Sequence, residues 1–106
     1  MGKKPGGWLM KLLIRVVEIK GKCPVYKVGN IITLREGYIL DPEETDIVCM
    51  HSLASVIPYY VALAKGIGSK ELGLSHGDSR EAYVQCLDPC EITGGGTVCL
   101  EISRVQ

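Results

Sequence analysis

The segment at residues 11–20, KLLIRVVEIK, limits the fold more than any other part of the chain. It is rich in β-branched residues, and both of its alternating sets of side chains are mostly apolar. A strand that is apolar on both faces is typical of the buried middle of a sheet. We therefore predict a central strand here, which ends before Gly21.

Three later segments have the composition and boundaries of shorter strands. Each contains β-branched or aromatic residues, and the first two are followed by a turn or a polar loop. The last two are separated by DPCEITGGG, which we interpret as a long hairpin loop. The three predicted strands are residues 31–36, 81–87 and 97–103.

One helix is predicted between these strands, because apolar residues recur there at steps of three and four. The acidic segment 41–46, DPEETD, precedes it and suits a helix amino terminus, with Thr45 or Asp46 as the cap. Pro58 interrupts the helix, so a kink is expected, or two helices that meet near residue 57. The apolar stripe consists of Cys49, Leu53, Val56, Tyr60, Leu63 and Ile67.

A chain of 106 residues has room for one domain. Residues 1–9 are rich in glycine and lysine and are predicted to form a loose arm, which leaves residues 10–106 as the domain. Local hairpins beside a helix favour the α+β class. The expected fold is a small, mainly antiparallel sheet of about four strands, packed on one bent helix with its kink near Pro58.

The charges suggest neither a nucleic acid nor a membrane as partner. Twelve basic residues balance twelve acidic ones, and Lys11 and Arg15 break the apolar stretch that follows residues 1–9, so it is not expected to span a membrane. Basic residues gather in 1–27 and acidic residues in 36–46, which we interpret as two faces that attract each other within one subunit or between subunits. Small domains with a marginal core often associate, so a symmetric homo-oligomer is expected. The predicted location is the cytoplasm.

Five cysteines are the main chemical feature of the sequence. Thiols stay reduced in the cytosol, so they indicate metal binding, redox chemistry or simple burial before disulfides. Asparagine and glutamine are scarce, as in proteins of thermophiles, where intracellular disulfides do occur. Cys86 and Cys90 flank an Asp-Pro turn and could form a redox pair, while Cys49 at a helix start is the best nucleophile.

A metal site is the alternative use of these thiols. Zinc prefers four nitrogen or sulfur ligands, and Cys86 and Cys90 have a spacing that structural zinc sites use. Cys23 and Cys49 could converge with them, because helix starts commonly lie against sheet ends in layered folds. The hypothetical ligands of zinc or iron are Cys23, Cys49, Cys86 and Cys90, with His51 as the alternative fourth ligand.

Several short motifs follow one another along the chain in a recognisable order. A strand ends in Gly-x-Cys, the sequence KVG follows, a helix that a cysteine begins reaches PYYVAL, and Val-x-Cys precedes Asp-Pro. These motifs lie at residues 21–23, 27–29, 49–63 and 84–89.

In this order the motifs resemble a family of small, uncharacterised prokaryotic proteins, over residues 10–103. The resemblance implies that Cys23, Cys49 and Cys86 are recurring cysteines of that family; it implies no reaction. Asn30 stands where the family pattern has Asp, and its helical histidine would fall near Ala54. Cys90 and Cys99 are particular to this chain.

No catalytic set of residues and no cofactor-binding motif is recognisable. The segment GGGT at 94–97 lacks the Lys-Ser/Thr ending of a phosphate-binding loop, and the chain has no phenylalanine and one tryptophan to build a large aromatic cavity. The leading interpretation is a non-catalytic, oligomeric module. A thiolate metal-binding protein and a thiol-redox protein are the two alternatives.

Overall fold

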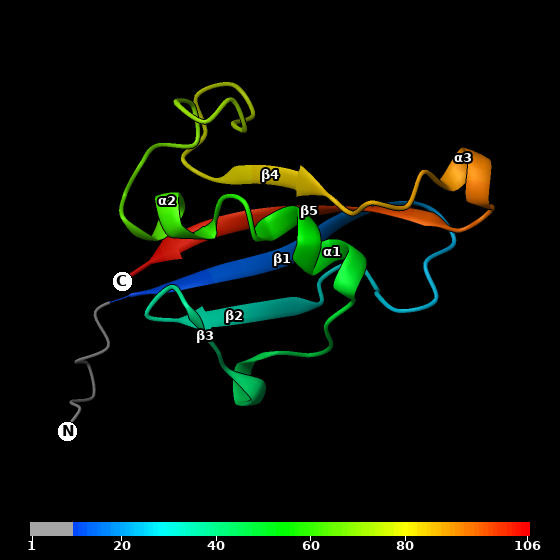
Figure 1. The fold of residues 1–106 in the computed structure, drawn as a ribbon, viewed down its shortest axis with the longest axis horizontal. Coiled ribbons are helices and arrows are strands. Elements are labelled where there is room, and N and C mark those ends of the chain that lie inside the picture. Colours follow the sequence, from blue (N-terminus) through cyan, green and yellow to red (C-terminus); the bar gives the residue numbers. More distant parts are fainter. Residues whose placement is uncertain (1–9) are drawn as a thin grey trace.

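A five-stranded antiparallel sheet forms the framework of the protein (Figure 1). The computed structural model describes residues 10–106, so the predicted arm at residues 1–9 lies outside the described residues. The strand order is β3-β2-β1-β5-β4, and helices accompany the sheet, which confirms the α+β class. The strands are β1 (Lys11–Gly21), β2 (Ile31–Arg35), β3 (Ile39–Leu40), β4 (Ala82–Gln85) and β5 (Gly96–Val105).

The strand predicted to be central is central. β1 pairs with β2 on one side and with β5 on the other, along nearly its whole length from Lys11↔Val105 to Gly21↔Gly96. The register shifts between Val16 and Glu18, where β1 carries one extra residue, as in a β-bulge. The pattern of apolar residues thus predicted the position of β1 in the sheet correctly.

The hydrophobic core lies on one face of the sheet, between the strands and two short helices (Figure 1). Alternate residues of every long strand point to this face, as the period of two requires. The fully buried side chains include Leu12, Ile14, Val16, Ile32, Val56, Val98 and Leu100. Lys11, Thr33 and Arg35 alternate with core residues, so they lie on the opposite face of the sheet.

The predicted helical region forms two short helices, α1 (Met50–Val56) and α2 (Tyr60–Ala64), rather than one bent helix. Pro58 lies between them, and its ring and missing N–H prevent the first helix from continuing. The chain turns there with a hydrogen bond from Tyr59 N to Val56 O of 2.9 Å. This is the second of the two forms that the proline predicted.

The segment 41–46 does not cap the helix, contrary to the prediction for Thr45 and Asp46. Its residues form a short 3-10 helix, η1 (Pro42–Glu44), which Asp41 caps. Thr45 and Asp46 instead accept backbone N–H bonds from Thr33 and Ile31 of β2. Because the open side of β2 offers unpaired N–H groups, these side chains bind there rather than at a helix that begins later. The segment thereby covers the outer side of β2.

The hairpin between β2 and β3 turns tightly at Glu36 and Gly37. Both have positive φ, 58° and 86°, and the N–H of Tyr38 bonds to the carbonyl of Arg35. These are the features of a type I′ turn, which suits the twist of a hairpin. Gly37 is also buried, because the chain around Ala64 of α2 packs directly on it.

Two small elements went unpredicted. The two-residue strand β3 adds a fifth strand to the sheet, and the loop at 88–96 contains one helical turn, α3 (Cys90–Thr93).

Among residues 10–106, no helix has both the length and the apolar character needed to cross a bilayer.

Candidate functional site

Cys23 lies in the loop that follows β1, and it is half-buried against the core. The backbone N–H groups of Val25 and Tyr26 both donate to its sulfur, at 3.4 Å each. Proline at position 24 fixes the bend that turns these two amides back toward the sulfur. The Cys23 thiol is therefore a hydrogen-bond acceptor within its own loop.

Cys86 and Cys90 lie near the same end of the sheet. Cys86 is buried where β4 ends, and its sulfur accepts the N–H of Val98 at 3.2 Å. Cys90 begins α3 and packs against Gly21, since a Cβ on that glycine would lie 3.3 Å from the Cys90 Cβ. Cys23, Cys86 and Cys90 thus lie in one region, where the loop after β1, the start of β5 and α3 meet.

Cys49 is hydrogen-bonded to Tyr26, a residue of the loop that contains Cys23. The N–H of Cys49 donates to the buried hydroxyl of Tyr26 at 2.8 Å, and that hydroxyl also bonds with Ser52 at 2.6 Å. Cys49 is the residue before α1, as predicted, but His51 in the first turn is exposed. The structure therefore places Cys49 near the Cys23 loop and leaves His51 on the surface.

These contacts do not assemble a metal site. Within the described part of the chain, no group of three or more histidine, cysteine, aspartate or glutamate residues could hold a metal ion. All five cysteines are free. Cys23, Cys49 and Cys86 instead contribute to, or pack against, the hydrophobic core. Metal binding and thiol-redox activity stay predictions, which this arrangement does not support.

Cys99 lies on the opposite face of the sheet from Cys86, beside acidic side chains. Burial raises the pKa of the Cys99 thiol and the charges of Glu18 and Glu101 raise it further, while the charge of Lys20 partly opposes them. On the same face, the hydrogen bond to Glu101 raises the pKa of Tyr83, with further contributions from burial and from the charge of Glu101. A thiol in this setting is a poor nucleophile at neutral pH.

Alkylation of Cys99 by iodoacetamide is therefore expected to be slow at pH 7 and to accelerate only above the ordinary pKa of a thiol, because the thiolate is the reacting form. Peptide mapping by mass spectrometry over a pH series measures this rate in the folded protein. Glu18→Gln, which removes one of the nearby negative charges, should shift the profile to lower pH. Rapid labelling of Cys99 at pH 7 would contradict the expectation.

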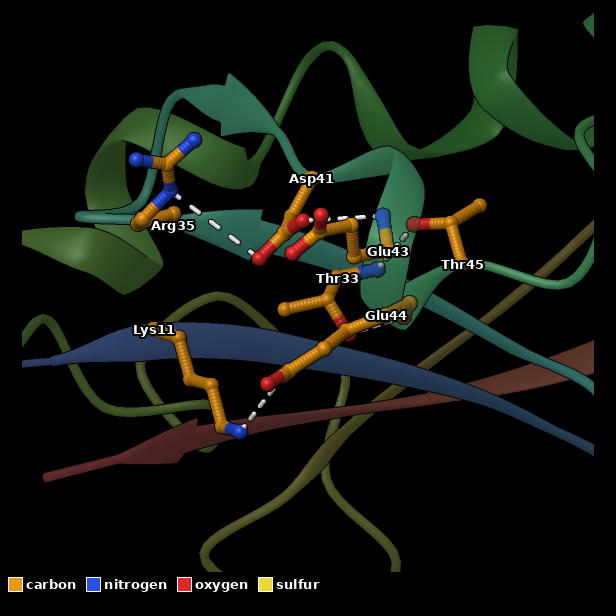
Figure 2. Close-up of polar contacts among 7 residues, drawn as sticks. All are labelled: Lys11, Thr33, Arg35, Asp41, Glu43, Glu44 and Thr45. Carbon is orange, nitrogen blue, oxygen red and sulfur yellow. Dashed lines mark hydrogen bonds and ion pairs between the residues drawn. The ribbon is translucent and has the colours of Figure 1, made fainter.

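A polar cleft of about 660 Å³ lies elsewhere, on the sheet face opposite α1 and α2. β1 and β2 form its floor and η1 forms one wall, so the segment that covers the outer side of β2 also shapes the cleft (Figure 2). Its volume is within the usual range of small-molecule sites. The lining residues are Met10, Lys11, Thr33, Arg35, Asp41, Pro42, Glu43, Glu44 and Gln106.

The wall of the cleft is held firmly. Thr33 is 1% exposed, and its hydroxyl donates to the carbonyl oxygen of Glu44 at 2.6 Å while its N–H donates to Thr45. The N–H of Asp41 donates to the Thr33 carbonyl at 2.9 Å, and one carboxylate oxygen of Asp41 accepts the N–H of Glu43. η1 is thus fixed to β2 at both of its ends.

Two cations project from the floor. Lys11 and Arg35 are partners in the register of β1 and β2, and they separate toward different carboxylates. Lys11 Nζ forms an ion pair of 2.9 Å with Glu44, as Figure 2 shows. This pair joins the basic and the acidic regions of the sequence within one chain, which was one of the two expected ways for them to meet.

Arg35 is different, because its head lacks a hydrogen bond. Its Nε is 3.9 Å from an Asp41 oxygen, which is close enough for attraction but too long for a hydrogen bond. Nε is also inaccessible to solvent, and it has no acceptor among the residues that the structure describes. A buried donor without an acceptor is uncommon in folded proteins and raises the question of what satisfies it.

Sequence reasoning missed this cleft. Lys11 and Arg35 were part of strand patterns, and the carboxylates of 41–46 were interpreted as the start of a helix. One signal was present: Lys11, Thr33 and Arg35 alternate with core residues of the first two strands, which marks a locally polar patch beside the acidic segment. This signal does not show that Lys11 and Arg35 lie side by side, because their proximity depends on the pairing of β1 with β2.

Comparison of the chain with protein-family models, with curated proteins and with solved structures found no match. The resemblance to the family of small prokaryotic proteins stays a prediction, based on the motifs described above.

Proposed function

We propose that this protein is a non-catalytic ligand-binding module and that the polar cleft between β1, β2 and η1 is its binding site. This develops the interpretation of the sequence as a non-catalytic module by giving that module a site. The groups that line the cleft are charged recognition groups on a rigid floor and wall. Rigid, preorganised sites lose little free energy to ordering when a ligand binds.

One observation supports the proposal above the others: Arg35, at the cleft, has 41% of its side chain exposed, and its one ion pair among the described residues is the long contact of Nε with Asp41. A guanidinium group presents five N–H donors in a planar fork that fits a carboxylate. Because Nε is inaccessible to solvent, an incoming carboxylate would instead accept hydrogen bonds from the terminal N–H groups of Arg35, which donate to no residue that the structure describes. We therefore expect Arg35 to provide the main anchoring interaction of the ligand.

Titration of ¹⁵N-labelled protein with small carboxylates at low ionic strength tests the site. Amide shifts are expected for residues of β2 and η1, with saturation in the millimolar range or below. Arg35→Gln should weaken binding by about tenfold or more, since charge-assisted hydrogen bonds contribute roughly 1.5–3 kcal/mol.

Arg15→Gln is the matched control, because Arg15 is an exposed arginine on the same face that lies 3.8 Å from Glu101, away from the residues of the cleft. It should leave the affinity unchanged. Equal losses in the two variants would indicate a general effect of charge, and the absence of shifts around the cleft would refute the proposal.

A further inference from the structure

Building on the proposed function, we infer that the ligand of the cleft is a free amino acid, recognised by Arg35 through its carboxylate and by Asp41 and Glu43 through its ammonium group.

The balance of charge disfavours a simple anion. Two cations and three carboxylates line the cleft, and Lys11 is already paired with Glu44. Glu43 is exposed and has no ion pair among the described residues, while the one ion pair of Asp41 there is the long contact with Arg35. An anion bound to Arg35 would therefore lie near uncompensated negative charge, which like-charge repulsion makes unfavourable.

A simple cation is disfavoured for the opposite reason. It would interact with Asp41 and Glu43, but it would be repelled by the positive charge of Arg35 and would leave that guanidinium with only its long contact to Asp41. A zwitterion satisfies both signs of charge at once.

The spacing of the two protein charges indicates which zwitterion fits. Arg35 Nε and the Asp41 oxygen are 3.9 Å apart, so the groups that they bind must also be close together. In an α-amino acid the ammonium and carboxylate groups are attached to the same carbon atom. A chain with its amine several carbons from its carboxylate would have to fold back on itself, at a cost in conformational entropy.

The rest of the cleft offers space for a side chain. Its volume of about 660 Å³ exceeds what the two charged groups need, and Met10, Pro42 and Gln106 line it as well. The end of the Met10 side chain lies near Gly37, and the Gln106 amide bonds with Arg104, so Pro42 supplies the apolar surface here. An uncharged ligand side chain of small or medium size therefore fits better than a charged one.

The test compares matched ligands by ¹⁵N titration and calorimetry at low salt. L-Alanine and L-leucine carry both charges; N-acetyl-L-alanine keeps only the carboxylate and L-alaninamide keeps only the ammonium group. The amino acids are expected to bind at least about tenfold more tightly than either blocked compound, which is a difference of about 1.4 kcal/mol.

Two variants assign the charges. Asp41→Asn keeps an oxygen that can accept the Glu43 N–H, so η1 is preserved, but it loses the charge that attracts an ammonium group. It should weaken amino acid binding by about tenfold and leave N-acetyl-L-alanine unaffected or bound more tightly. Arg35→Gln should weaken binding of both.

The outcomes separate the two proposals. If N-acetyl-L-alanine binds the cleft as tightly as L-alanine, the cleft is a carboxylate site and the amino acid inference is wrong, while the proposed function stands. If L-alaninamide binds best, Arg35 is not the anchor and both proposals fail. Both also fail if none of the four compounds shifts the amides of β2 and η1.

Discussion

Replacing Gly37 with alanine is expected to lower the free energy of unfolding by about 3 kcal/mol or more. Two costs add at this position. The residue has φ of 86°, which an L-amino acid with a Cβ rarely adopts. The new Cβ would also lie 2.6 Å from the Cβ of Ala64, so α2 would have to move away from the hairpin. A Cβ cannot rotate away as the end of a long side chain can.

Gly29→Ala separates the two costs. Gly29 has a similar φ of 98°, but no atom lies within 4 Å of the position of its Cβ. Its replacement should cost only the backbone strain, about 1 kcal/mol. Urea unfolding followed by circular dichroism measures both values. Equal losses of stability in the two variants would show that α2 does not pack against Gly37 as described.

Tyr26→Phe is expected to lower the free energy of unfolding by about 2 kcal/mol, although it removes one oxygen atom. The Tyr26 side chain is 4% exposed, and its hydroxyl accepts the N–H of Cys49 at 2.8 Å. Ser52 retains an acceptor in the carbonyl of Cys49, but the Cys49 N–H would be left without a partner at the start of α1. An unsatisfied donor in a packed region costs about 1–3 kcal/mol.

Tyr38→Phe is the control for the loss of a tyrosine hydroxyl. Tyr38 is 71% exposed, and no hydrogen bond of its hydroxyl is found among residues 10–106. The change should therefore alter stability by less than about 0.5 kcal/mol. Chemical unfolding gives both values, and amide hydrogen exchange should additionally show faster exchange at Cys49 in Tyr26→Phe. If exchange at Cys49 is unchanged, the hydroxyl of Tyr26 is not its partner.

The sheet was largely predictable, because burial on one face leaves a period of two in the sequence and burial on both faces leaves a continuous apolar run. β1 was predicted as central from its two apolar faces, and the shared face of Ala82, Val84 and Cys86 is the one that meets the core. The break at Pro58 followed from the covalent structure of proline. Local rules of this kind operate without knowledge of the rest of the fold.

The segment 41–46 shows where local rules fail. Its composition suited the start of a helix, yet the open side of β2 competes for the same side chains. Thr45 and Asp46 bind there because unpaired N–H groups of a strand are satisfied by whichever acceptors the fold brings near. Only the pairing of strands decides that competition, and this pairing is not a local property.

The same limit applies to the candidate site. Cysteine spacing led to a metal hypothesis. In the structure, Cys23, Cys49 and Cys86 belong to the core or pack against it, and the Cys23 thiol accepts a hydrogen bond within its own loop. The unsatisfied donor of Arg35 depends on a distance of 3.9 Å to Asp41, across a hairpin and a turn. No sequence pattern encodes a distance that is slightly too long for a hydrogen bond.

The pairing of β1 with β5 has a consequence for how quickly the native state forms. These two strands come from opposite ends of the described chain, yet they pair along nearly their whole length in the middle of the sheet. Their association must close a loop that contains almost every other element, and such non-local pairing slows folding. During synthesis, the middle of the sheet would stay incomplete until β5 has left the ribosome, so a chaperone could bind β1 in that interval.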